Sequence, residues 1–239
     1  MKKEQVVLME NNQKGIKHTL ETILDLIKKG DIKVTLQKIY KNLYYKIKGI
    51  DFSMQSLKEL DIQNPHKAHA TICGSSSQET MENILDTICK LHPSIRQGLF
   101  VDIGSGKGRL LHTAYKYGFE RYLGVEFSEQ LATISKENFK KLNIFDVEIL
   151  TMDATTFIPP KDTRVLYLLN PFDDVVLTKF LKQVLKYHHF YQHDIYIIYR
   201  APVFKEVFEK FNTIKHLKTV DFHGDISEIY LLRQQEKIK

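Results

Sequence analysis

The stretch Phe100-Val-Asp-Ile-Gly-Ser-Gly-Lys-Gly-Arg-Leu-Leu111 decides the fold of this chain. An apolar run leads into Asp102, three glycines alternate at positions 104, 106 and 108, and an apolar helical pattern begins at Leu110. This order predicts a buried parallel strand, a tight turn and the start of a helix. Glycines let a ligand approach the main chain closely, and a helix N-terminus offers free N–H groups. We therefore expect a nucleotide-like cofactor at this turn.

Three kinds of glycine loop join a strand to a helix in this way, and their spacing separates them. The phosphate loop of NTPases ends in Gly-Lys-Ser/Thr, whereas Lys107 is followed by Gly108 and Arg109. The dinucleotide loop, Gly-x-Gly-x-x-Gly, would place its third glycine at Arg109. A carboxylate repels a pyrophosphate, so Asp102 beside the loop favours a cofactor that carries positive charge.

Polar residues also end the next three predicted strands. The second strand ends at Glu126, 24 residues after Asp102, the third ends at Asp153, and the fourth ends in Asn170-Pro171-Phe172. A carboxylate at Glu126 can accept hydrogen bonds from the hydroxyls of a ribose. Because the carboxyl ends of parallel strands meet at one edge of a sheet, these residues indicate a single cofactor site.

This succession resembles the class I S-adenosylmethionine (SAM) methyltransferases over about residues 75–232, with the glycine spacing similar to their motif I. It also resembles bacterial methyltransferases of unassigned substrate that carry a Gly-Lys-Gly-Arg loop and an Asn-Pro-Phe motif. A more distant similarity is to the non-SET histone lysine methyltransferases. Those enzymes hold the cofactor with an acid before a serine, and Cys73-Gly74-Ser75-Ser76 lacks that acid.

The resemblance implies SAM as the cofactor and assigns the residues that hold it, with Asp153 accepting the adenine amino group. The implied cofactor-binding residues are Asp102, Gly104, Ser105, Gly106, Gly108, Glu126, Phe127, Asp153, Ala154 and Asn170. Lys107 and Arg109 keep two interpretations. Either side chain could meet the SAM carboxylate or a substrate anion, or could simply be solvated.

The predicted catalytic residues are Asn170, Pro171 and Phe172. They are similar to the Asn/Asp-Pro-Pro-Tyr/Phe motif of enzymes that methylate amino groups, one proline short. In that family the polar side chain and a nearby carbonyl orient the target nitrogen, and the aromatic ring stacks on the substrate. An attacking amine must be neutral, so Asp173 or Asp174 could take its proton. A helix-initiating turn is the alternative interpretation of Asn170-Pro171.

Composition indicates a globular protein of ordinary size. The 239 residues are 43% hydrophobic and 27% charged, and no apolar run is long enough for a transmembrane helix. Cys73 and Cys89 fit no metal or disulfide pattern, which favours a reducing cytoplasm. Three histidines at positions 188, 189 and 193 have no neighbouring acid or cysteine to complete a site, so we expect no metal.

The net charge is concentrated at the N-terminus. Residues 1–48 hold eleven lysines and five acids, which equals the net charge of +6 of the whole chain. Lysines are interleaved there with tyrosines, as at Lys41, Tyr44, Tyr45 and Lys46. Such a segment can bind nucleic acid through its phosphates and bases, or can be an ordinary solvated helix face with packed tyrosines.

The pattern along the chain predicts an α/β fold. We expect a seven-stranded, mostly parallel Rossmann-like methyltransferase sheet with helices on both faces, closed by a C-terminal hairpin around Gly224-Asp225. Helices are predicted over residues 15–29, 35–47, 77–90, 109–117, 128–142, 174–187 and 203–211. Residues 1–74 form an N-terminal helical cap over the cofactor in this prediction, and residues 75–239 form the SAM-binding domain.

These predictions together favour a cytoplasmic SAM-dependent methyltransferase. The expected acceptor is an amino nitrogen of a protein or a small molecule. A nucleic-acid methyltransferase and a regulator that binds SAM or S-adenosylhomocysteine without transferring a methyl group are the two alternatives. The sequence predicts no insertion into a membrane.

Overall fold

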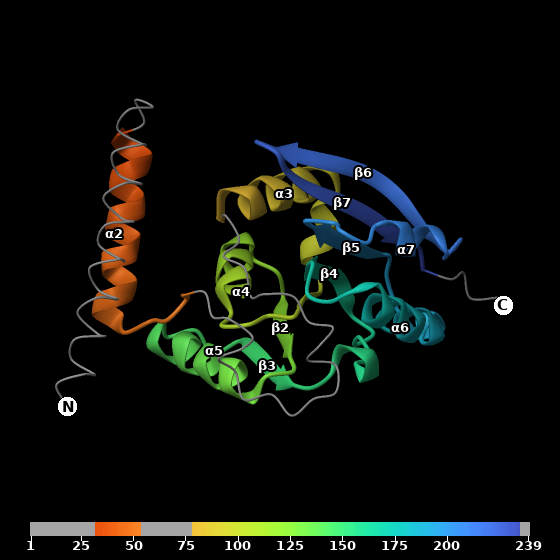
Figure 1. Cartoon of the computed structure of the whole chain (residues 1–239), viewed down its shortest axis with the longest axis horizontal. Coiled ribbons are helices and arrows are strands. Elements are labelled where there is room, and N and C mark those ends of the chain that lie inside the picture. Colours follow the sequence, from red (N-terminus) through yellow and green to blue (C-terminus); the bar gives the residue numbers. More distant parts are fainter. Residues whose placement is uncertain (1–31, 54–77, 235–239) are drawn as a thin grey trace. The chain divides into compact units, whose positions relative to one another are not determined.

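The computed structural model in Figure 1 describes residues 32–53 and 78–234. The chain divides into two compact units, Met1–Ile50 and Asp51–Lys239. The predicted helix over residues 15–29 and the predicted domain boundary after residue 74 lie outside the described residues.

The described part of the first unit is one helix. Helix α2 (Ile32–Lys48) corresponds to the helix predicted over residues 35–47. The residue after its end is Gly49, which has φ +64° and whose N–H donates to the carbonyl of Lys46 at 3.1 Å. The ammonium of Lys41 lies 5.7 Å from the ring centre of Tyr45, so part of the predicted basic and aromatic pattern is brought together on this helix.

The second unit is built on a seven-stranded sheet in the order β3-β2-β1-β4-β5-β7-β6. The first five strands run parallel, and β7 pairs antiparallel with both β5 and β6. The predicted seven-stranded sheet and its closing hairpin are therefore confirmed. The strands are β1 (Leu99–Ile103), β2 (Arg121–Glu126), β3 (Val147–Thr151), β4 (Thr163–Leu169), β5 (Ile195–Arg200), β6 (Ile214–Phe222) and β7 (Asp225–Leu232).

Helices cover both faces of this sheet (Figure 1). They are α3 (Gln78–Leu91), α4 (Arg109–Ala114), α5 (Glu129–Lys141), α6 (Asp174–Lys186) and α7 (Glu206–Glu209). Side chains of α3, α4 and α5 pack with Phe100 and Tyr167 in one hydrophobic cluster. Side chains of α6 and α7 pack in a second cluster with Val101 and Leu168. Alternate residues of a strand thus enter different clusters, as the pleat requires.

Two predicted helices are shorter than the sequence pattern indicated. Helix α4 ends at Ala114 and a 3₁₀ turn completes the segment to Tyr117, before Gly118 reverses the chain at φ +68°. Helix α7 is a single turn within the predicted span 203–211. No side chain caps its first turn, and its aromatic and β-branched residues have low helix propensity.

Among the described residues, no helix is long and apolar enough to cross a membrane.

Candidate cofactor and active site

The carboxyl ends of β3, β2, β1 and β4 lie side by side at one edge of the sheet. Their order brings the four predicted positions, Asp153, Glu126, Asp102 and Asn170, to that edge from segments far apart in the chain. The glycine loop, residues Gly104–Gly108, leaves β1 in the middle of the row. The prediction that one edge collects these residues is confirmed as an arrangement of the fold.

The glycine loop and the turn after β4 approach each other closely. Gly104 has φ +76°, and a Cβ atom placed on it would lie 2.6 Å from Cβ of Pro171. A side chain there would therefore meet both backbone strain and a clash. Gly108 is confined in a similar way, because a Cβ on it would lie 2.4 Å from Oγ of Ser135 on α5.

A pocket opens between the glycine loop and the turn after β4. Its lining residues are Gly104, Val125, Phe127, Met152, Asp153, Ala154, Pro171, Phe172 and Val176. Six of these nine were predicted as site residues. Val125, Met152 and Val176 were missed, although the first two immediately precede the predicted acids and the third lies in the first turn of α6. A mainly apolar pocket with a few polar groups suits a small organic ligand.

Asp153 lies at the polar side of this pocket. Its Oδ1 accepts hydrogen bonds from the N–H of Thr155 at 2.8 Å and from the hydroxyl of Thr155 at 2.7 Å. The side chain thereby caps the short 3₁₀ turn Ala154–Thr156. The carboxylate is half-buried, and its capping bonds fix its orientation at the pocket wall.

Glu126 is buried and turned toward the glycine loop. Its Oε2 accepts from the N–H of Gly106 at 2.8 Å and its Oε1 from the N–H of Ser128 at 2.9 Å. Burial raises the pKa of this carboxyl, while the two backbone N–H groups act in the opposite direction. Glu126 therefore holds the loop backbone as well as occupying the position predicted for a ribose contact.

Asp102 is wholly buried beneath the glycine loop. Neither of its carboxylate oxygens has a hydrogen-bond partner among the described residues. Burial, with a smaller contribution from the negative charge of Glu126, raises the pKa of Asp102 to about 8. A buried acid without a donor is costly in its ionised form, so Asp102 holds a proton over much of the neutral range.

Asn170 is held by a residue that the sequence analysis missed. It adopts φ +37°, and its Oδ1 accepts a hydrogen bond of 2.8 Å from the hydroxyl of Tyr199 on β5. Phe172 is 8% exposed, lines the pocket and packs against Phe180 of α6, with 6.1 Å between the ring centres. Asp173 caps α6, since its Oδ1 accepts from the N–H groups of Val175 and Val176 at 3.1 Å each.

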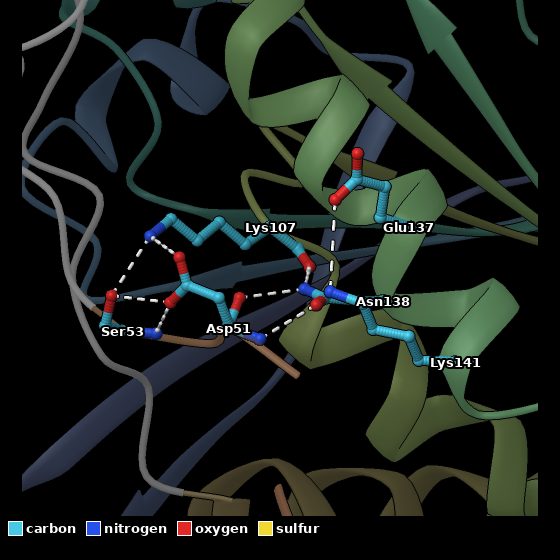
Figure 2. A network of polar contacts seen from close by, with 6 residues as sticks. All are labelled: Asp51, Ser53, Lys107, Glu137, Asn138 and Lys141. Carbon is cyan, nitrogen blue, oxygen red and sulfur yellow. Dashed lines mark hydrogen bonds and ion pairs between the residues drawn. The ribbon is translucent and has the colours of Figure 1, made fainter. Parts of the chain in front are cut away.

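The structure rules out one of the two interpretations of Lys107, that its side chain is solvated. Its side chain is 6% exposed, and its ammonium donates to Oδ2 of Asp51 at 2.7 Å and to Oγ of Ser53 at 3.0 Å. Figure 2 shows this ammonium directed at Asp51 and Ser53. Lys107 is thus an internal anchor of the glycine loop, and solvation of this side chain is excluded.

The comparisons with known proteins agree with this arrangement. A model of a methyltransferase domain family matches residues 101–191, from within β1 to Tyr191 in the segment between α6 and β5. An uncharacterized methyltransferase of Alkaliphilus oremlandii is 34% identical over 80 residues. That match covers 33% of this chain and 37% of the relative, so the chain spans little more than a third of the length of the curated protein it matches.

Solved structures share the fold at low sequence identity. One of them is yhhF of Escherichia coli, which is provisionally assigned as a methyltransferase. It superposes on this chain with a TM-score of 0.54 and 15% sequence identity, covering 68% of this chain and 90% of that one. An RNA methyltransferase of Salinibacter ruber in complex with S-adenosylhomocysteine superposes with a TM-score of 0.50 and 16% sequence identity. The superposition covers 70% of this chain and 98% of that one. The family model therefore matches the part of the chain that carries the glycine loop and the pocket, and the solved structures share its fold, which supports the resemblance inferred from the glycine loop.

Proposed function

We propose that this protein is a SAM-dependent methyltransferase that binds SAM at the carboxyl edge of its sheet. The observation that carries the proposal is the pocket between the glycine loop and the Asn170–Phe172 turn, lined by both predicted cofactor residues and predicted catalytic residues. The pocket is mainly apolar with a few polar groups, and Gly104 leaves the main chain open to a ligand. The residues present therefore fit the cofactor that the class I fold implies.

The cofactor contacts follow from the lining of the pocket. Phe127, Ala154 and Met152 supply apolar surface for an adenine ring, and Asp153 supplies an acceptor for its amino group. Glu126 is the proposed acceptor for the ribose hydroxyls. Asp102 at the end of β1 and Ser105, Gly106 and Gly108 of the glycine loop are proposed to form the wall of the site behind the ribose. Bound SAM would supply a methyl group on a positively charged sulfur, which an acceptor atom attacks in line.

The contribution of the chain to that reaction is placement. Orienting an acceptor and excluding water can lower a barrier by about 7–11 kcal/mol. Pro171 and Phe172 shield one side of the pocket, and Asn170 stands at the adjoining end of β4. We propose an amino nitrogen as the acceptor, because the Asn170 amide and the carbonyl groups of this turn are acceptors for its N–H groups. Asp173 already caps α6, which leaves Asp174, exposed in the next position, as the proposed proton acceptor.

A nucleic acid is the second candidate acceptor, supported by helix α2. Lys46 and Lys48 lie in its last turn, and Lys41 stacks over Tyr45. Phosphate contacts by such lysines would make the affinity for RNA or DNA fall steeply as salt is raised, whereas a flat response would remove this candidate.

The decisive experiment combines isothermal titration with SAM and an assay with tritiated SAM on cell extract. Saturable SAM binding and labelled acceptor together support the enzyme. Saturable binding without any labelled species supports the alternative of a SAM-binding regulator. Failure of the folded wild-type protein to bind SAM overturns both. An Asp153→Ala variant, expected to bind SAM at least roughly tenfold more weakly, ties the binding to this pocket.

A further inference from the structure

The strongest feature outside the pocket is a polar network that joins Asp51–Ser53, the anchor segment, to the glycine loop (Figure 2). Besides the Lys107 bonds described above, Asn138 on α5 binds the main chain of Asp51 in both directions. Its Oδ1 accepts from the N–H of Asp51 at 2.8 Å, and its Nδ2 donates to the carbonyl of Asp51 at 2.8 Å. The same Nδ2 donates to the carbonyl of Lys107 at 3.0 Å.

The burial of this network makes its charges interdependent. Asn138 is fully buried and Lys107 is 6% exposed, so the Lys107 ammonium has lost most of its water. A buried cation needs a counter-charge, and Asp51 supplies it. The Lys107 and Ser53 hydrogen bonds lower the pKa of Asp51 against the opposing effect of burial, so this carboxylate stays ionised at neutral pH. Loss of either partner would leave a charge without its match.

Side chains hold the flexible glycine loop from two sides. Gly104, Gly106 and Gly108 all adopt positive φ, and glycine-rich backbone has more conformational freedom to lose than any other. Glu126 holds the loop on one side through the N–H of Gly106. Lys107 and Asn138 hold it on the other side, the former through its ammonium and the latter through the Lys107 carbonyl.

We propose that Asp51, Lys107 and Asn138 are positioning residues that hold the glycine loop in its SAM-binding conformation, so that the anchor segment is a functional part of the cofactor site. This inference rests on the proposed function, because it assumes that the loop binds SAM. The physical reason is preorganisation. A loop already ordered by the anchor segment does not have to be ordered at the expense of binding free energy.

Isothermal titration with SAM tests the proposal on the full chain. Asp51→Asn and Lys107→Met should each bind SAM roughly tenfold more weakly than wild type, the change expected when a hydrogen-bonded charge loses its partner. The double variant should lose little more than the worse single variant, because both changes remove the same interaction. Two surface ion pairs supply matched controls, Lys116→Met beside Glu82 and Asp162→Asn beside Arg121, and both should bind SAM as wild type does.

A second measurement separates positioning from a merely structural role. In protein labelled with [¹⁵N]glycine, Asp51→Asn should shift or broaden the amide signals of Gly104, Gly106 and Gly108, while Gly118 and Gly224 stay unchanged. Saturating SAM should restore the loop signals toward those of wild type. Asp51 is 45% exposed, so this variant is the one expected to fold if Lys107→Met does not.

The outcomes distinguish this inference from the proposed function. Folded variants that bind SAM within about twofold of wild type, with unchanged loop signals, would overturn the inference and leave the function intact. A wild-type protein that does not bind SAM would overturn the function. The glycine signals would then still report whether the anchor segment orders the loop.

Discussion

The hydroxyl of Tyr199 and the amide oxygen of Asn170 are joined by a hydrogen bond of 2.8 Å between β5 and the end of β4. Burial raises the pKa of Tyr199 to about 12, so the hydroxyl remains a donor throughout the neutral range. The same hydroxyl accepts from the N–H of Phe204 at 3.3 Å. These bonds fix which end of the Asn170 amide accepts and which donates at the turn.

Tyr199→Phe is therefore expected to reduce methyl transfer while leaving SAM binding unchanged. Phenylalanine keeps the packing but removes the donor, so Asn170 can rotate away from its working orientation. We expect a rate of label transfer from tritiated SAM roughly tenfold below wild type, corresponding to about 1.4 kcal/mol. Tyr191→Phe is the matched control, since Tyr191 is also buried and donates to the carbonyl of Val184 at 3.0 Å. Equal losses in the two variants would show that Tyr199 has only a structural role.

Gly104→Ala is expected to weaken SAM binding and to destabilise the fold. The added methyl group would lie 2.6 Å from Pro171 at a residue with φ +76°, so the two turns that flank the pocket must move apart. We expect a loss of about 1–3 kcal/mol in the free energy of unfolding and at least roughly tenfold weaker binding of SAM.

Gly118→Ala provides the control for that experiment. Gly118 has φ +68°, but a Cβ on it meets nothing within 4 Å. Alanine there should cost about 1–2 kcal/mol of stability through backbone strain and leave the dissociation constant for SAM unchanged. If both alanine variants bind SAM equally well, the contact between Gly104 and Pro171 does not shape the pocket.

The parts of the site that were predictable from the sequence are those set by short-range patterns. The strand, the glycine spacing and the helix start occupy twelve consecutive residues, 100–111, so the turn could be located from one segment. Glu126, Asp153 and Asn170 could be assigned because each follows an apolar run, and the parallel sheet then brings those run ends together.

The parts that could not be predicted depend on contacts between distant segments. Lys107 finds its partner 56 residues earlier in Asp51, and Asn138 binds Asp51 across 87 residues. Contacts between residues so far apart in the chain leave no pattern in a single sequence. Asn138 carries one local signal, since a polar residue lies on the buried face of α5 near Leu131 and Phe139. Tyr199 could not be recognised as a site residue, because in the sequence a tyrosine in an apolar strand is indistinguishable from a packing residue.

The stability of the protein should fall as pH rises through neutrality, in part because of Asp102. Its pKa is about 8 in the folded chain and 3.8 for an unperturbed carboxyl. The folded state thus binds a proton that the unfolded state has released, and this contribution is complete below about pH 4 and is lost as pH rises through 8. Thermal melts between about pH 5.5 and 8.5 should show a smaller decline in Tm for Asp102→Asn than for wild type. Parallel curves for the two proteins would show that Asp102 does not titrate in this way.

The carboxylate of Asp153 should determine which base the pocket accepts. A carboxylate can accept a hydrogen bond from the amino group of adenine but has no donor for the 6-oxo group of hypoxanthine. Wild type should therefore bind S-adenosylhomocysteine roughly tenfold or more tightly than S-inosylhomocysteine, as measured by isothermal titration. In Asp153→Asn this preference should shrink, because the amide can donate to the 6-oxo group while its oxygen keeps the bonds to Thr155. Thr155→Val, which removes a hydroxyl bonded to Asp153 but keeps the carboxylate, should retain the wild-type preference. An unchanged preference in Asp153→Asn would place the adenine amino group elsewhere in the pocket.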